Sequence, residues 1–106
     1  MISSHDISSA AASTQTQNFQ TAYPNRTAGG KFPKADVQEL LNQSGCTELR
    51  YYFGLADPAK PNEITLVLVG VDANGNDMVN NKLKNSASPC PPWCGASNLL
   101  NHISNK

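Results

Sequence analysis

The sequence predicts an α+β fold in which two helices precede a short antiparallel β-meander of two or three strands. Two observations lead to this prediction: apolar residues recur at helical spacing before position 45, and two stretches between residues 47 and 71 have strand-like patterns. With 106 residues the chain is long enough for one core. We expect a single small domain over 1–106, with a helical part at about 4–45, a sheet at about 47–83 and an irregular Pro/Cys/Trp segment at 86–106.

The first helix is expected over residues 4–22. Ser3 or Ser4 can cap it, and Asp6 lies in the first turn, where a carboxylate favours the helix dipole. The proline after Tyr23 ends it, because the residue before a proline is pushed out of the helical region. The apolar stripe consists of Ile7, Ala11, Ala12, Phe19 and Tyr23.

A loop over residues 24–32 leads to the second helix. Pro33 suits its first helical position, and Asp36 suits the first turn. Ser44-Gly45 closes the helix with a glycine at the place of a left-handed C-cap. Its apolar stripe consists of Val37, Leu40 and Leu41.

Two strands form the centre of the predicted meander. Residues 47–55 alternate between apolar and polar, which indicates a strand with one buried face. Residues 64–71 are apolar on both faces, a pattern typical of a central strand covered on both sides. The expected buried face of the first strand consists of Leu49, Tyr51, Phe53 and Leu55.

The run from Asp72 to Asp77 is rich in Asp and Asn and resembles a calcium-binding loop. An EF-hand loop requires glycine at its sixth position and an acidic residue at its twelfth, where this chain has Asp77 and Leu83. The Asn-Gly pair at 74–75 instead predicts a hairpin turn. Residues 78–83 then return as a third, edge strand.

If both helices cover one face of this sheet, the other face needs a separate cover. That face would present Val67, Val69 and Val71. The segment around Trp93 is one candidate cover, and a second copy of the protein is another.

The most unusual segment is Cys90-Pro91-Pro92-Trp93-Cys94, whose spacing differs from the C-x-x-C of thiol oxidoreductases. Two prolines favour an extended backbone that places the two Cα atoms beyond the roughly 7 Å limit for a disulfide. A cis proline or a sharp turn at Trp93 would permit the bond. We interpret the segment as a structural clasp, with Trp93 packed on the sheet and the thiols buried as small hydrophobes; an exposed polyproline-type docking surface is the alternative.

A metal site is a further interpretation of the cysteines. Cys46, Cys90, Cys94 and His102 would make a Cys3His zinc set. Structural zinc sites usually bring their ligands in two tight pairs, and Cys46 stands alone, so we expect no bound metal and no cofactor. A longer disulfide from Cys46 to Cys90 or Cys94 stays open for an oxidising environment.

Charge and motifs narrow the function classes. Eight basic and eight acidic residues give a net charge of zero, and no Lys/Arg cluster of the kind that binds nucleic acid is present. The sequence contains neither a phosphate-binding glycine loop nor a recognisable nucleophile motif. Arg50 is expected to pair with Glu48 or Glu63. A catalytic site composed only in the fold would draw on Arg50, Tyr52 and Asp77.

The first residues lack the basic segment and apolar run of a secretory signal. The longest apolar run, residues 64–71, is too short to span a bilayer. An odd number of cysteines fits a reducing compartment. We therefore expect a cytoplasmic protein without a membrane partner, although export without a cleavable signal stays open.

Three segments together resemble a group of small, uncharacterised bacterial proteins: Leu49 to Gly54, Leu66 to Met78, and the Cys-Pro-Pro-x-Cys run at 90–94. The resemblance covers roughly residues 30–100. It implies a bacterial source and a self-standing domain, and it carries no activity with it.

These observations predict a non-enzymatic protein that works through protein–protein contacts as a homo-oligomer or with another protein. The expected interaction residues are Pro91, Pro92, Trp93, Val67, Val69 and Val71. The alternative is a thiol- or metal-dependent function at Cys46, Cys90 and Cys94.

Overall fold

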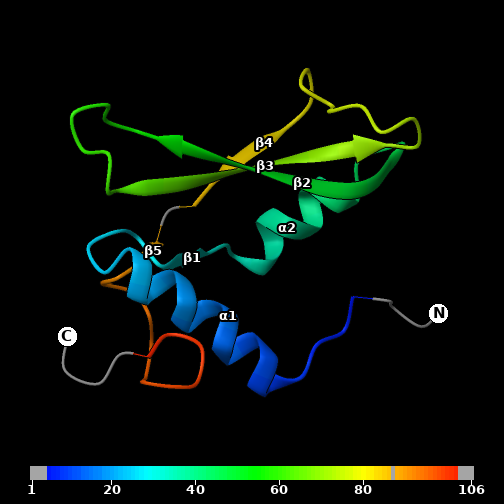
Figure 1. The fold of residues 1–106 in the computed structure, drawn as a ribbon. Helices are drawn as coiled ribbons and strands as arrows, with labels where there is room; N and C mark the ends of the chain where they lie inside the picture. Colours follow the sequence, from blue (N-terminus) through cyan, green and yellow to red (C-terminus); the bar gives the residue numbers. More distant parts are fainter. Residues whose placement is uncertain (1–4, 87, 103–106) are drawn as a thin grey trace.

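A computed structural model describes residues 5–86 and 88–102 and confirms the α+β class (Figure 1). These residues form two helices, a three-stranded antiparallel sheet in the order β2-β3-β4, and a two-stranded sheet of β1 and β5. The elements are α1 Ser9–Ala22, β1 Gly29–Lys31, α2 Lys34–Leu41, β2 Cys46–Leu55, β3 Ile64–Asp72, β4 Leu83–Asn85 and β5 Ser88–Cys90.

Helix α1 begins later than the sequence predicted. Ser8 is its N-cap, with an extended backbone and a side-chain oxygen that accepts a hydrogen bond from the Ala11 amide at 3.0 Å. Asp6 therefore precedes the helix, and the predicted caps at positions 3 and 4 lie outside the described residues. The predicted end is confirmed, since Ala22 is the last helical residue and Tyr23 is the C-cap.

Helix α2 is shorter than predicted at both ends. Pro33 is its N-cap rather than its first helical residue, and Asn42 is the C-cap. Gly45, with φ +86°, serves the tight turn that leads into β2 instead of capping the helix. The helix ends where Gln43 turns its side chain toward the sheet region and donates its amide back to the Leu40 carbonyl at 2.9 Å.

Strands β2 and β3 form the long hairpin that the alternating pattern predicted. Tyr51 pairs with Leu68 at its centre, and a bulge lies between Cys46 and Glu48. The turn at the far end of β3 is confirmed: the Gly75 amide donates to the Asp72 carbonyl at 3.0 Å, and Gly75 has φ +82°.

The third strand differs from its predicted position at 78–83. Strand β4 starts at Leu83 and pairs with β3 from Val67 to Val69. The stretch before it leaves the sheet because the Lys82 amide donates to the Gln43 side chain at 3.0 Å. A contact with the turn that follows α2 therefore competes with strand pairing over this stretch.

The small β1–β5 sheet joins parts of the chain that were expected to form a loop and an irregular segment. Gly29 pairs with Cys90, and Lys31 pairs with Ser88. Strands of three residues carry no readable alternation, and their partners are far apart in the sequence.

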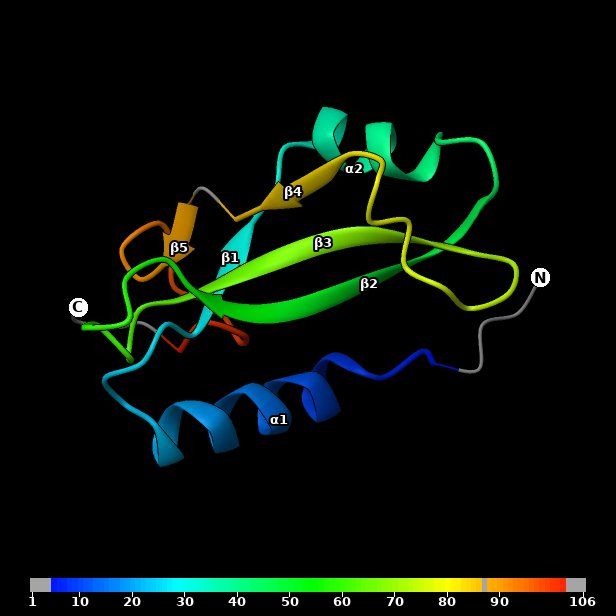
Figure 2. The ribbon, with the colours of Figure 1, turned by 90° about the horizontal axis from the view of Figure 1, so that it is seen from above.

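Both helices lie on the same side of the sheet in Figure 1, but over different strands. Seen from above in Figure 2, α2 lies beside β4, whereas α1 lies beyond β2. Lys84 of β4 anchors α2 through ion pairs to Glu39 at 2.7 Å and Asp36 at 3.6 Å. A side chain at Gly70 would meet Gln43 and Cys46 atoms at 3.0 Å, so glycine permits the close approach at this end of α2.

Candidate functional site

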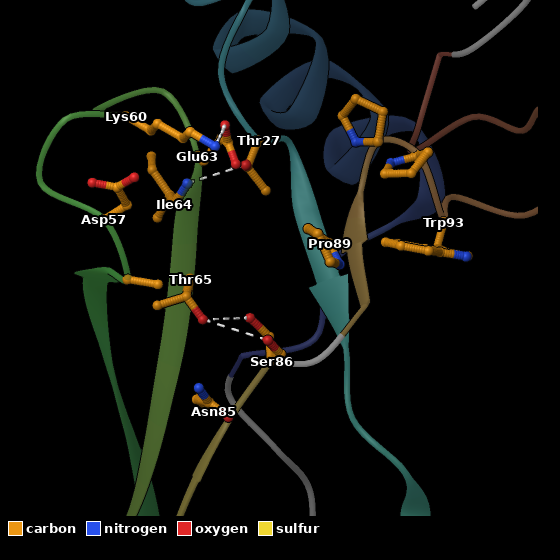
Figure 3. A pocket seen from close by; sticks show the side chains of 13 residues that line it. Thr27, Asp57, Lys60, Glu63, Ile64, Thr65, Asn85, Ser86, Pro89 and Trp93 are labelled. Carbon is orange, nitrogen blue, oxygen red and sulfur yellow. Dashed lines mark hydrogen bonds and ion pairs between the residues drawn. The ribbon is translucent and has the colours of Figure 1, made fainter.

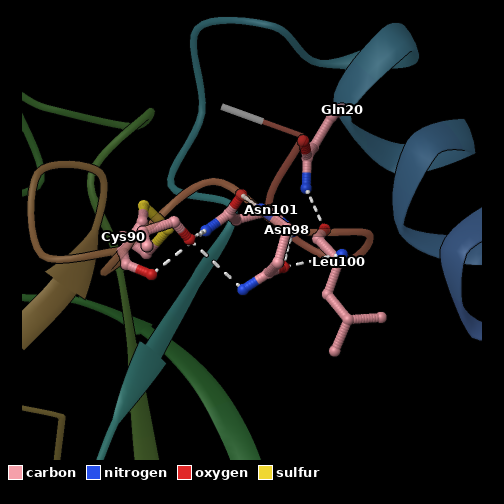
Figure 4. Close-up of a disulfide and its surroundings, with 7 residues drawn as sticks. Gln20, Cys90, Asn98, Leu100 and Asn101 are labelled. Carbon is pink, nitrogen blue, oxygen red and sulfur yellow. Dashed lines mark hydrogen bonds between the residues drawn. A yellow bond between two sulfur atoms is a disulfide. The ribbon is translucent and has the colours of Figure 1, made fainter. Parts of the chain in front are cut away.

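The segment that the sequence singled out is closed by a disulfide between Cys90 and Cys94, whose Cα atoms are 4.7 Å apart (Figure 4). The expectation that the prolines hold the two thiols apart was wrong. That expectation assumed trans peptide bonds, and both the Cys90-Pro91 and the Pro91-Pro92 bonds are cis. The two cysteines therefore act as a covalent clasp rather than as separate buried thiols.

Two asparagines that the sequence analysis did not select organise the chain after the clasp. Asn101 is 8% exposed, and its side-chain amide donates to the carbonyls of Cys94 at 3.1 Å and Ala96 at 2.9 Å. Asn98 accepts from the Leu100 and Asn101 amides at 2.8 and 3.0 Å. Asparagine side chains commonly stabilise turns in this way, so their spacing of three residues was the available signal.

The same segment is fastened to α1. Gln20 donates to the Leu100 carbonyl at 3.1 Å, and the His102 ring lies 3.0 Å from the Thr16 hydroxyl and 3.1 Å from the Ser13 carbonyl. His102 is thus engaged with α1 rather than with the cysteines.

Trp93 is not buried against the three-stranded sheet, contrary to our structural interpretation. Its side chain is 58% exposed, and strands β1 and β5 lie between it and β3 in Figure 3. An open cleft of about 550 Å³ runs between this segment and the loop that joins β2 to β3. Trp93, Pro91 and Pro92 line one wall, and Ile64 and Lys60 lie on the other.

The proposed zinc ligands do not come together in the described part of the chain. Cys46 is a free, half-buried thiol whose sulfur donates to the Glu48 carbonyl at 3.3 Å. Cys90 and Cys94 are bonded to each other, and His102 contacts α1. Among residues 5–86 and 88–102, three or more metal-binding side chains are nowhere grouped.

The fold does assemble Arg50, Tyr52 and Asp77. The Arg50 guanidinium and the Tyr52 hydroxyl each donate to a different oxygen of the Asp77 carboxylate, at 2.5 Å. The expected pairing of Arg50 with Glu48 or Glu63 was therefore wrong. The hydrogen bond from Tyr52, followed by that from Arg50, lowers the pKa of the Asp77 carboxyl below its ordinary value.

This cluster explains how the chain covers its own valines. Arg50 and Tyr52 pair with Val69 and Val67 across β2 and β3, whereas Asp77 pairs with Val71 on the opposite side of β3. The two side chains must therefore cross β3 to reach the carboxylate. Residues 69 and 71 are only 2% exposed, so these two predicted interaction residues belong to the core of the single chain, and Val67 is half-buried.

A catalytic site at this cluster would need a deep polar cleft beside it. The nearest hollow, about 480 Å³, is open to solvent and is lined by Glu48, Leu49, Arg50, Tyr51 and Val71. Tyr52 and Asp77 do not line it, and both carboxylate oxygens are already engaged by the cluster. The arrangement fits a structural bridge over β3.

Strand β2 carries an exposed apolar surface. The predicted buried face of this strand is largely exposed: Tyr51 is 63%, Phe53 75% and Leu55 45% accessible. Within residues 5–86 and 88–102, strand β2 pairs with β3 alone, so its other edge is open there. The periodicity had identified these residues as one face correctly. Helix α2 lies beside β4 and helix α1 lies beyond β2, and the three side chains remain exposed.

Comparison of the chain with protein-family models, with curated proteins and with solved structures found no match. Within the described residues, no helix has the length and apolar character needed to cross a membrane.

Proposed function

We propose that this chain is a small, non-enzymatic bacterial protein that acts through protein–protein contacts and self-associates. The observation that supports the proposal is the ten-residue strand β2, which combines an unpaired edge with exposed aromatic side chains. Such an edge is a template for pairing with another chain unless charge, proline or a covering element blocks it. Strand β2 contains no proline and only two charged residues, Glu48 and Arg50.

Self-association also meets no electrostatic barrier from the chain as a whole. The net charge is zero, so two copies do not repel each other at long range. Pro91, Pro92 and Trp93 form a second exposed surface, which the disulfide and the asparagine turns hold in place. We assign this second surface to contacts with another protein.

Light scattering and sedimentation over a wide range of protein concentrations test the proposal. We expect the mass to rise with concentration from that of one chain to that of an oligomer. A strict monomer at the highest concentration would contradict self-association.

The Cys90–Cys94 disulfide favours a second candidate, a thiol-dependent function. In a redox cycle, the reductant would be the dithiol of a partner protein, which reduces the Cys90–Cys94 disulfide and itself becomes a disulfide. Thiol titration in glutathione buffers measures the potential of the pair. A potential near the cellular poise would favour this candidate, whereas a bond that resists reduction would favour the structural clasp. The Cys46→Ser variant, which keeps the disulfide, is the control.

The disulfide also bears on where the protein works. Disulfides persist in oxidising compartments, whereas most cytoplasms keep cysteines as reduced thiols. The cytoplasmic location expected from the sequence therefore remains a prediction. Counting free thiols in protein alkylated at the moment of cell lysis tests it: three per chain fits the cytoplasm, and one fits an oxidising compartment.

A further inference from the structure

The hydrogen bonds of β3 show which backbone groups of β2 are unpaired. The carbonyls of Leu66 and Gly70 accept from the Ser86 and Met78 amides at 2.9 Å, so these residues of β3 point toward the β4 side. Because direction alternates along a strand, Val67 and Val69 point toward β2 and bond to their partners Tyr52 and Arg50.

It follows that the intervening residues of β2 direct their amides and carbonyls outward. These residues are Leu49, Tyr51 and Phe53. Tyr51 and Phe53 are also the most exposed aromatic side chains of β2. The unpaired edge and the apolar face thus belong to the same residues.

The pattern of these residues is symmetric about Tyr51. Leu49 and Phe53 stand two positions away on the same face, and Arg50 and Tyr52 flank Tyr51 on the other face. If two copies of β2 pair antiparallel about a twofold axis at Tyr51, apolar side chains meet apolar ones. Tyr51 faces the partner's Tyr51, and Leu49 faces the partner's Phe53.

One neighbouring register is less favourable. A twofold axis at Arg50 places that residue opposite the partner's Arg50, and like charges directly opposite each other destabilise a strand pair. The axis at Tyr51 instead places Arg50 opposite the partner's Tyr52, so the two arginines are not directly opposite each other.

The position of α1 supplies an independent observation. This helix buries none of its residues in the single chain, and Phe19 and Tyr23 remain partly exposed. Figure 2 shows α1 beyond the β2 edge, and Figure 1 shows it below the level of the sheet. A strand added to β2 would lie over α1 and give the helix a surface to pack against.

We propose that the partner in self-association is a second copy of this chain, bound edge to edge through β2 in the register centred on Tyr51. This inference rests on the proposed function and specifies its interface. Two three-stranded sheets then join into one continuous sheet of six strands. The pairing is isologous and closed, so it produces a dimer in which the open β2 edge of each copy is paired.

Cysteine cross-linking tests the register. In a Cys46→Ser background, Tyr51→Cys places two thiols directly opposite each other, at a Cα separation of about 5.5 Å that permits a disulfide. Phe53→Cys is the matched control, because the partner's Phe53 lies four residues away along the added strand, on the order of 13 Å. We expect mild oxidation to link the first variant as a dimer and to leave the second unlinked. Linking of Phe53→Cys without Tyr51→Cys would overturn the register.

A charge substitution tests the edge itself. Tyr51→Lys places two like charges opposite each other, and we expect it to raise the dimer dissociation constant about tenfold or more. Val79→Lys is the control, because Val79 is exposed to a similar extent, 62% against 63%, and lies away from β2. Circular dichroism verifies that both variants are folded.

The outcomes separate the two proposals. A wild-type protein that is monomeric at every concentration overturns self-association and the β2 interface together. A wild-type dimer that survives Tyr51→Lys unchanged overturns only the β2 interface. A dimer that is lost in Tyr51→Lys and retained in Val79→Lys supports both.

Discussion

The side chains of Arg50, Tyr52 and Asp77 illustrate how a polar group can complete an apolar core. Arg50 is 43% exposed at its side chain and Asp77 18%, yet together with Tyr52 they span β3 and shield two valines from water. From the sequence, these three residues were grouped only as candidates for a catalytic site composed in the fold. Their grouping depends on the register of β2 against β3 and on the turn after Asp72, which local spacing does not reveal.

The lowered pKa of Asp77 predicts a specific dependence of stability on pH. A carboxyl whose pKa is lowered on folding adds stability above its ordinary value of 3.8, and this contribution is lost as the pH falls through the lowered value. We expect the free energy of unfolding to fall in acid, and to fall less steeply in Asp77→Asn. Denaturant unfolding from about pH 6 to about pH 2 measures both slopes.

Tyr52→Phe is the companion variant, because the Tyr52 hydroxyl is the largest cause of the lowered pKa. We expect it to raise the pKa of the Asp77 carboxyl toward its ordinary value, as followed by NMR titration. An unchanged titration of Asp77 in this variant would show that the hydrogen bond does not act as described.

At the scale of elements, α2 holds the sheet and α1 does not. Leu40 of α2 is completely buried, and ion pairs from Lys84 fix the helix beside β4. The apolar stripe of α2 was readable from its spacing. For α1 the spacing predicted a helix correctly but not its packing, because none of its residues is buried.

Two adjacent leucines of α2 test this division. Leu40→Ala removes a side chain that is 0% exposed, and we expect a loss of about 2–5 kcal/mol in the free energy of unfolding. Leu41→Ala removes the same group from a position that is 46% exposed, and we expect less than about 1 kcal/mol. Equal losses in chemical denaturation would contradict the assignment of Leu40 to the core.

At the scale of the molecule, the described part of the chain leaves one edge of its longest strand, β2, unpaired and buries no residue of helix α1. Both features lie along β2. The proposed dimer would pair the open edge of β2 and give α1 a surface to pack against. The disulfide clasp and its asparagine turns lie at the β1–β5 sheet, so the Trp93 surface stays outside this interface.

Amide hydrogen exchange at two protein concentrations gives a residue-resolved prediction. The amides of Leu49, Tyr51 and Phe53 point outward, so we expect them to exchange quickly in dilute protein and slowly in concentrated protein. The amides of Arg50 and Tyr52 bond to β3 and should be protected at both concentrations. Outer amides that exchange at the same rate under both conditions would argue against pairing through this edge.

Local patterns in the sequence were sufficient for the fold class, the β2–β3 hairpin and the turn after Asp72, because each depends on residues close together along the chain. The Cys90–Cys94 bond, the β1–β5 sheet and the cover over Val69 and Val71 became visible only in the tertiary structure. The pairing of β1 with β5 and the clasp's attachment to α1 join distant segments, and the cysteine bond depends on a backbone conformation that residue types alone do not specify. The tertiary structure also decided which apolar face is exposed to water. Tyr51 and Phe53 of β2 are exposed and Val69 and Val71 of β3 are buried, because this depends on where distant segments of the chain are placed.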